Sequence, residues 1–272
     1  MTSSPYKLLV IDIDGTLVDK NHAISAEDKE ALAKARDFGV RVSLSTGRSH
    51  QGCLAILNQL SLGGYHIFFD GALIANPEAS NEVYVEPLSQ VVVRQAIDFA
   101  HSNDIDLDIY STTDYFVERE TWSADAHRQF FGMEPRIVDF TKLWSQERII
   151  KMGLVATPSQ GDKIKNFCSH FGDSCHFSRA KTPAYPTIEF INVVAPGVSK
   201  GKALGALVSH SGISLSEVIA IGDGFNDIPL FSVAGLAVAM DNAPDEVKAV
   251  ADHITLDVAQ SGAAAAIEKF LL

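Results

Sequence analysis

The amino-acid sequence predicts an α/β fold in which a doubly wound parallel-sheet core is interrupted by an inserted α+β domain. Strand-like and helix-like segments alternate in both terminal thirds of the chain, whereas the middle third carries paired strands. Alternation of this kind builds parallel sheets with helices on both faces, and paired strands build antiparallel sheets. With 272 residues, the chain is long enough for a large core and a second domain.

The N-terminal third reads as strand, helix, strand, helix, strand. Its first strand is an apolar run without polar alternation, which is typical of a strand buried on both faces. Ser25 followed by Asp28 resembles a helix-capping arrangement, and Gly39 ends that helix. Gly47 and Arg48 open the second predicted helix. The predicted strands span 7–12, 40–44 and 65–69, and the helices span 25–38 and 47–60.

The middle and C-terminal parts complete the predicted domain organisation. Two strands flank a turn at 111–114, and helical and further strand segments surround them, which indicates an α+β module. From Ser199 the alternation of helix and strand resumes. We therefore expect a Rossmann-like core from residues 1–85 and 192–272 and an inserted domain at 86–191.

Composition excludes several classes of protein. Apolar residues make up 46% of the chain, so a packed core is expected, and the net charge of −12 argues against a nucleic-acid-binding surface. The longest apolar runs are too short to span a membrane, and the first residues lack the pattern of a signal peptide. The three widely spaced cysteines are interpreted as reduced thiols, so a cytoplasmic location is expected.

Polar residues and glycines follow every predicted core strand. In an open parallel sheet, ligands bind beyond the carboxyl ends of the strands, where the strand order reverses. Taken singly, Thr46-Gly47 has an ordinary explanation as a helix cap and Lys200 could be a solvated helix residue, whereas the motifs DIDGT and GDGFND each favour a functional site. Together they predict a site. The loops are Asp12-Ile13-Asp14-Gly15-Thr16, Ser45-Thr46-Gly47-Arg48, Asp70-Gly71-Ala72, Gly197-Val198-Ser199-Lys200-Gly201 and Gly222-Asp223-Gly224-Phe225-Asn226-Asp227.

These residue types suit phosphoryl transfer beside a hard cation. The carboxylates of Asp12, Asp223 and Asp227 are oxygen ligands of the kind that Mg²⁺ prefers. Asp12 is the expected nucleophile that forms an aspartyl-phosphate, and Asp14 is the expected general acid and base.

Four groups are expected to hold the phosphate. The hydroxyl of Thr46 and the amides of Gly15 and Gly47 are candidate donors to its oxygens, and helices that begin at these glycines would add a positive dipole end. Lys200 supplies a positive charge for the same oxygens.

The motifs DIDGTLVD, STGR, GVSKGKAL and GDGFNDIPLF resemble the four motifs of the haloacid dehalogenase (HAD) superfamily of phosphatases. The later stretch AMDNAPDEVKAVADHIT is similar to its Cof-type subgroup, and the inserted domain resembles the C2B cap of that subgroup. The resemblance implies a Mg²⁺ site formed by Asp12, the backbone carbonyl of Asp14 and Asp223, with Asn226 and Asp227 in support.

The resemblance implies a phosphatase for small phosphorylated metabolites, with sugar phosphates as the expected substrates. A sugar phosphomutase and a non-catalytic phosphoacceptor or ligand-binding regulator stay open as alternatives, although a phosphoacceptor does not need a general acid at Asp14. Candidate substrate residues are Arg48, Arg119, Arg179 and Tyr185, and Trp122, His127 and Arg128 are further polar or aromatic candidates of the inserted domain.

Two positions depart from the family pattern. Asp70 stands where the family often has Asn, and Asp241 stands where it often has Gly. Both changes add negative charge, which would disfavour highly anionic substrates or position a substrate hydroxyl or amine. The simpler interpretation, that both are solvated loop residues, is slightly favoured.

Overall fold

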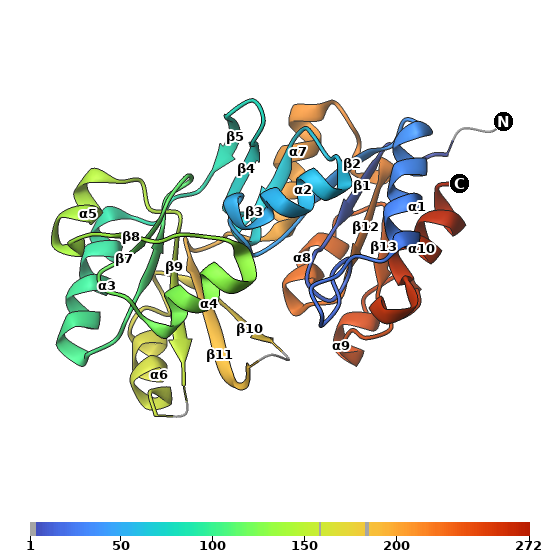
Figure 1. Cartoon of the computed structure of the whole chain (residues 1–272). Coiled ribbons are helices and arrows are strands. Elements are labelled where there is room, and N and C mark those ends of the chain that lie inside the picture. Colours follow the sequence, from blue (N-terminus) through green and yellow to red (C-terminus); the bar gives the residue numbers. More distant parts are fainter. Residues whose placement is uncertain (1–3, 158, 183–184) are drawn as a thin grey trace. The chain divides into compact units, whose positions relative to one another are not determined.

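The computed structural model describes residues 4–157, 159–182 and 185–272, which form two compact units. The first unit comprises residues 1–47, 55–84 and 199–272, and the second comprises 48–54 and 85–198 (Figure 1). A catalytic role for the first unit and a role in substrate specificity for the second stay predictions.

The first unit is built on a five-stranded parallel sheet in the order β14-β13-β12-β1-β2. This confirms the predicted doubly wound core. The chain leaves β1 towards β2 on one side and later returns to β12 on the other, so the strand order reverses between β1 and β12. The strands are β1 (Leu8–Ile11), β2 (Arg41–Leu44), β12 (Val218–Gly222), β13 (Leu236–Ala239) and β14 (His253–Ile254).

Helices cover both faces of this sheet. Figure 1 shows α1 (Ala26–Asp37) beside α10 (Gly262–Phe270) on one face and α7 (Lys200–Ser211) with α8 (Ile228–Phe231) on the other. Leu8 and Val10 point from β1 into the apolar cluster formed with α7 and α8. Helices α2 (Leu54–Leu60) and α9 (Asp245–Lys248) are further helices of this unit.

Two local predictions for the N-terminal third need correction. The third strand, β3 (His66–Phe68), joins the parallel sheet only through a bridge between Ser45 and Ile67. It pairs antiparallel with β4 (Leu73–Asn76), because the turn at Phe69–Gly71 reverses the chain, and β5 (Asn81–Val85) lies beside β4.

The second helix also starts later than predicted. Its first turn, of 3₁₀ type, is Gln51–Cys53 rather than Gly47, since the hydroxyl of Ser49 accepts a hydrogen bond from the amide of Gly52 at 3.1 Å.

The second unit contains a six-stranded sheet in the order β10-β11-β9-β6-β7-β8, antiparallel except for the last pair. The predicted strand pair around residues 111–114 is present as the β6–β7 hairpin. The strands are β6 (Asp108–Tyr110), β7 (Tyr115–Val117), β8 (Arg136–Ile137), β9 (Lys151–Ala156), β10 (His176–Thr182) and β11 (Tyr185–Val194). The helices are α3 (Gln90–Asn103), α4 (Trp122–Phe131), α5 (Phe140–Gln146) and α6 (Gly161–His170).

Alternate residues of this sheet build the core of the second unit. Ile109, Phe116 and Met152 are buried in one apolar cluster with side chains of α3, α5 and α6. The neighbouring residues Asp108 and Tyr110 point to the opposite face, as the period of two along a strand requires. An α+β unit inserted into the parallel-sheet unit is therefore the observed fold class.

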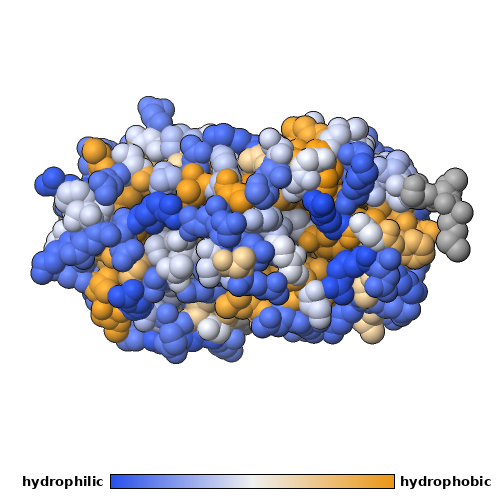
Figure 2. Space-filling model, turned by 90° about the horizontal axis from the view of Figure 1, so that it is seen from above, coloured by the Kyte–Doolittle hydropathy of each residue, from blue (hydrophilic) through white to orange (hydrophobic). Residues whose placement is uncertain are grey.

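On the face drawn in Figure 2, hydrophilic residues surround small hydrophobic patches. Within the described part of the chain, no helix is both long and apolar enough to cross a membrane.

Candidate active site

The loops after β1 and β12 lie side by side at the carboxyl edge of the parallel sheet. Ile11 pairs with Ile221, and the amide of Asp12 donates to the carbonyl of Ile221 at 2.9 Å. The register therefore brings Asp12 next to the loop that begins at Asp223. This is the point at which the strand order reverses, where open α/β sheets bind ligands.

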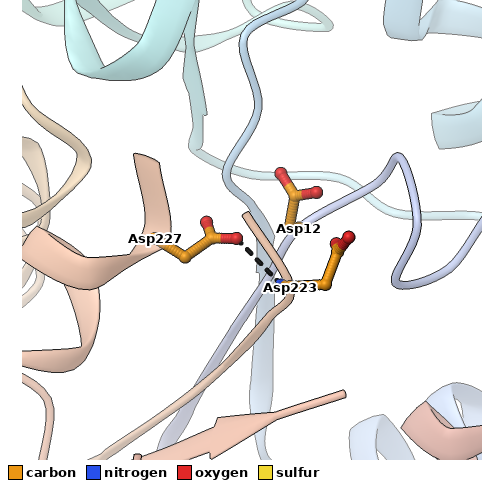
Figure 3. A group of neighbouring side chains, drawn as sticks. All are labelled: Asp12, Asp223 and Asp227. Atoms are coloured by element: carbon orange, nitrogen blue, oxygen red, sulfur yellow. Dashed lines mark hydrogen bonds between the residues drawn. The ribbon is translucent and has the colours of Figure 1, made fainter. Parts of the chain in front are cut away.

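Asp12, Asp223 and Asp227 form an acidic cluster in which one oxygen of each lies within 4.8 Å of the others. Figure 3 shows Asp12 at the end of β1, Asp223 directly after β12, and Asp227 on the helical turn that follows. Asp12 and Asp227 are buried, and Asp223 is partly buried. Carboxylates this close repel one another unless a cation neutralises them.

Lys200 supplies one such cation. Its Nζ donates to Oδ1 of Asp12 and to Oδ1 of Asp227, at 2.6 Å each, and the side chain is fully buried. Burial disfavours the charged ammonium, but the carboxylates of Asp12 and Asp227 outweigh it and raise the pKa of Lys200 above its ordinary value. Lys200 is therefore a permanent positive charge beside Asp12.

One lysine does not neutralise the whole group. Burial raises the pKa of Asp12 well above its ordinary range, and the attraction of Lys200 opposes this rise. Burial, assisted by repulsion from Asp227, raises the pKa of Asp223 to about 7. Both raised pKa values show that additional positive charge would stabilise the charged forms of Asp12 and Asp223. An all-oxygen donor set with surplus negative charge fits a hard divalent cation such as Mg²⁺.

Asp227 uses both of its oxygens within the protein. Oδ1 accepts from Lys200, and Oδ2 accepts from the amides of Asp223 and Gly224 at 3.0 and 2.9 Å. A Cβ atom at Gly222 would lie 2.4 Å from the same Oδ2, so only glycine fits there. Asp227 thus shapes the loop that presents Asp223, and its expected part in a metal site stays a prediction.

Asp14 lies two residues beyond Asp12 and is exposed. Its backbone bridges to Val18 in the turn that follows β1. An exposed carboxyl group on a turn can exchange protons with solvent and reach a leaving group, which is compatible with the expected acid and base role.

The candidate phosphate donors are at the same edge of the sheet. Thr46 is buried directly after β2, and its amide donates to Ile67. Gly15 has a φ of +87°, and a Cβ there would lie 2.3 Å from Oδ2 of Asp223, so this position requires glycine for both reasons.

The expected dipole contribution from helices at Gly15 and Gly47 is wrong. The nearest helix after Gly15 begins at Ala26, and the first turn after Gly47 begins at Gln51. The amide of Gly15 already donates to the carbonyl of Val18 at 3.0 Å, so it is not available as the expected phosphate donor, whereas the amide of Gly47 stays a prediction.

The candidate residues of the second unit have partners within that unit. Arg119 pairs with Asp106 at 2.8 Å, Arg179 pairs with Glu189 at 2.5 Å, and the Arg48 guanidinium lies 4.8 Å from the centre of the Phe131 ring. The side chain of Tyr185 lies outside the described residues. Their contact with substrate stays a prediction.

The remaining candidates of this unit also contact neighbouring side chains. His127 shares a hydrogen bond with Tyr110 at 2.8 Å, and Arg128 pairs with Glu120, Asp125 and Glu134. Trp122 stacks on Phe190.

Two residues that contact the acidic cluster were given no role from the sequence. The hydroxyl of Thr16 donates to Oδ1 of Asp223 at 2.7 Å, and Nδ2 of Asn242 donates to Oδ2 of Asp223 at 3.5 Å and to the carbonyl of Gly15 at 2.8 Å. Thr16 belongs to the motif DIDGTLVD, and Asn242 belongs to the stretch AMDNAPDEVKAVADHIT. Membership of these motifs was the signal in the sequence that could have pointed to both residues. Only the fold shows that Asn242, far along the chain, reaches the β1 loop.

Asp70 and Asp241, the two residues that depart from the family pattern, have different surroundings in the structure. Asp241 is 61% exposed and pairs with Lys248 at 3.1 Å, in agreement with a solvated loop residue. Asp70 is 4% exposed and accepts a hydrogen bond from Asn226, so its interpretation as a solvated residue is wrong.

The comparisons with known proteins agree with this geometry. The family model described as haloacid dehalogenase-like hydrolase matches residues 9–267. A 5-amino-6-(5-phospho-D-ribitylamino)uracil phosphatase of Bacillus subtilis is 30% identical over 267 residues, which cover 98% of this chain and 96% of the relative.

Two solved structures are similar over nearly the whole chain. A haloacid dehalogenase-like hydrolase from Bacteroides thetaiotaomicron is 30% identical with a TM-score of 0.86, covering 97% of this chain and 99% of its own. A HAD subclass IIB sugar phosphatase is 27% identical with a TM-score of 0.82, covering 97% and 98%. The chain therefore belongs to the haloacid dehalogenase-like hydrolase family.

Proposed function

We propose that this enzyme is a Mg²⁺-dependent phosphatase that hydrolyses phosphate monoesters of small metabolites through an aspartyl-phosphate on Asp12. The observation that carries the proposal is the buried carboxylate of Asp12, held at 2.6 Å by Lys200 and adjoined by Asp223. Such a carboxylate has a fixed orientation, and the surplus negative charge around it would be offset by a bound divalent cation before a phosphate approaches.

The proposed reaction has two halves. In the first, a carboxylate oxygen of Asp12 attacks phosphorus, the P–O bond to the substrate breaks, and Asp14 gives its proton to the leaving oxygen. In the second, Asp14 takes a proton from water, the water oxygen attacks the same phosphorus, the bond between phosphorus and the Asp12 oxygen breaks, and inorganic phosphate leaves. Both Asp12 and Asp14 return to their starting states.

The phosphate itself is assigned to the hydroxyl of Thr46, the amide of Gly47 and Lys200. Loop amides and a lysine are suited to the charge that develops on phosphoryl oxygens. A bound Mg²⁺ would be held by Asp12, the backbone carbonyl of Asp14 and Asp223, and it would supply positive charge next to the phosphate.

The substrate class is proposed from relatives of different specificity. The Bacillus subtilis relative is named for a phosphorylated ribityl compound, and the subclass IIB neighbour is named a sugar phosphatase. Polyhydroxylated phosphate monoesters are common to both, so sugar phosphates and related polyol phosphates are the proposed substrates. The free cysteines Cys53, Cys168 and Cys175 suit a reducing, cytoplasmic location.

The test is phosphate release from p-nitrophenyl phosphate, with Mg²⁺ or with a chelator, by the intact chain and by Asp12→Asn. We expect release that needs Mg²⁺ and falls at least 10³-fold in the variant. Equal release from Asp12→Asn would refute the nucleophile. A panel of phosphorylated metabolites then ranks the substrates, and a phosphomutase would instead return phosphate to a sugar without net release.

A further inference from the structure

The turn at Phe69–Gly71, directly after β3, has an unusual backbone. Phe69, Asp70 and Gly71 have φ angles of +53°, +56° and +106° in succession. The left-handed region costs a residue with a Cβ on the order of 1 kcal/mol, and Phe rarely adopts it. Strain of this kind persists only where the surroundings hold it, and it concentrates at functional sites.

The turn is held by two of the proposed active-site loops of the first unit. The amide of Asp70 donates to the carbonyl of Thr46 at 2.9 Å. A Cβ atom on Gly71 would lie 2.3 Å from the carbonyl oxygen of Ser199, the residue before Lys200, and a Cβ on Gly47 would lie 3.0 Å from Oδ1 of Asp70. The turn is therefore in van der Waals contact with the Thr46 loop and with the start of α7.

The side chain of Asp70 adds a third connection. Its Oδ1 accepts a hydrogen bond from Nδ2 of Asn226 at 2.8 Å, across 156 positions of sequence. A carboxylate only accepts hydrogen bonds, whereas an amide both donates and accepts. Asp70 therefore requires that the nitrogen of Asn226 faces it and that the oxygen faces away. The Asn226 oxygen indeed lies over Gly224, 2.5 Å from the position that a Cβ would take there.

We propose that Asp70 is a positioning residue, which fixes the amide orientation of Asn226 and couples the β12 loop to the Thr46 loop. An asparagine at position 70 would pair with Asn226 in either orientation and so would leave the orientation undetermined. Asp70 is not itself one of the proposed reacting groups, Asp12 and Asp14, and its charge also helps to raise the pKa of Lys200. Its effect on catalysis rests on the proposed phosphatase function, whereas its effect on Asn226 does not.

Three variants separate the carboxylate from the backbone. Asp70→Gly suits the left-handed backbone and removes the acceptor, and Asp70→Asn keeps an acceptor without enforcing the orientation. Asp104→Gly makes the same change at the exposed Asp104 of the second unit, which has a φ of +52°.

The expected kinetic result is a graded loss. With p-nitrophenyl phosphate, kcat should fall 10- to 100-fold in Asp70→Gly and about threefold in Asp70→Asn, with KM changed less than threefold. Asp104→Gly should equal the wild type. The kcat of the double variant Asp70→Gly/Asn226→Ala should be within twofold of that of Asn226→Ala alone, because the two substitutions remove the same interaction. A wild-type kcat in Asp70→Gly, or multiplicative losses in the double variant, would overturn the proposal.

A spectroscopic measurement tests the contact without turnover. In the metal-free protein, the Asn226 side-chain amide signals, assigned by their loss in Asn226→Ala, should exchange slowly with water. In Asp70→Gly they should exchange at least tenfold faster, and Asp70→Asn should show faster exchange or two sets of signals. Unchanged exchange in both variants would overturn the positioning role. If the wild type released no phosphate, the proposed function would fail, and this measurement would still decide the role of Asp70.

Discussion

Nζ of Lys200, at the start of α7, lies 2.6 Å from Oδ1 of Asp12, at the end of β1. The same nitrogen lies 2.6 Å from Oδ1 of Asp227. One buried cation thus links the proposed nucleophile to the residue that shapes the Asp223 loop. We therefore expect Lys200 to contribute to stability, in addition to its proposed part in phosphate binding.

Replacing Lys200 by Met should leave two buried carboxylates without their cation. Removing one partner from a buried ion pair typically costs about 3–5 kcal/mol, and we expect a loss of that size in the free energy of urea unfolding. Phosphatase activity should fall at least 100-fold. Lys202→Met is the matched control, because Lys202 is exposed on the same helix. A Lys200→Met protein as stable as the control would contradict this account.

Thr16→Val should weaken the binding of Mg²⁺. The Thr16 hydroxyl donates to Asp223 at 2.7 Å and is fully buried, so valine leaves the carboxylate without this donor and free to change its orientation. We expect a 3- to 30-fold weaker affinity for Mg²⁺ by titration calorimetry and a stability loss of about 1–2 kcal/mol. Thr16→Ser retains the hydroxyl and should behave almost as the wild type. Equal affinities of the valine and serine variants would count against the role of this hydrogen bond.

Asn242 and its neighbour Asp241 should respond differently to substitution. Asn242 donates to the carbonyl of Gly15 and to Oδ2 of Asp223, and it accepts from the amide of Val258 at 3.0 Å, so Asn242→Ala removes three contacts. It should lower stability by about 1–2 kcal/mol and reduce kcat severalfold. Asp241→Asn breaks only an exposed pair with Lys248, worth less than about 1 kcal/mol.

The substrate profile provides the second readout at this pair of positions. Asp241→Asn should leave the ranking of phosphorylated substrates unchanged, which a metabolite panel measures. A changed ranking would restore the hypothesis that Asp241 selects among substrates.

His66 should make the protein less stable in mild acid. Its Nδ1 accepts from the amide of Leu44 at 3.1 Å, and its Nε2 has no hydrogen-bond partner among the described residues. Burial lowers the pKa of His66 to about 4, whereas an unfolded histidine titrates near 6.5. Between these values the unfolded chain binds more protons, so this contribution to stability is complete above pH 6.5 and declines as the pH falls towards 4.

The measurement is urea unfolding of the wild type and of His66→Asn at pH 7.5 and pH 5. His66 should account for about 2 kcal/mol of the loss between these values, and His66→Asn should lack this portion. The exposed His22, replaced in the same way, should retain the wild-type dependence. Parallel curves for wild type and His66→Asn would show that His66 is not the titrating group.

The sequence by itself determined the parallel-sheet core and the inserted unit, and it supplied the motif residues of the candidate site. The apolar runs that end in Asp12 or Gly222-Asp223 are local signals. A few adjacent residues are enough to predict both that the strand is buried and that acidic side chains follow it. Because ligands bind an open parallel sheet beyond the carboxyl ends of its strands, the sequence alone predicts that these loops lie close together. The helix start at Gly47 was wrong because a side chain, Ser49, sets the first turn.

The tertiary structure alone decided which of these residues touch. Lys200 bonds Asp12 across 188 positions, Asn226 bonds Asp70 across 156, and Asn242 reaches Gly15 across 227. Such pairs depend on strand register and on how three loops pack at one edge, and no local pattern encodes either. The same is true of Asp70, which looks like a solvated loop residue in sequence and is buried because a strained turn carries it inward.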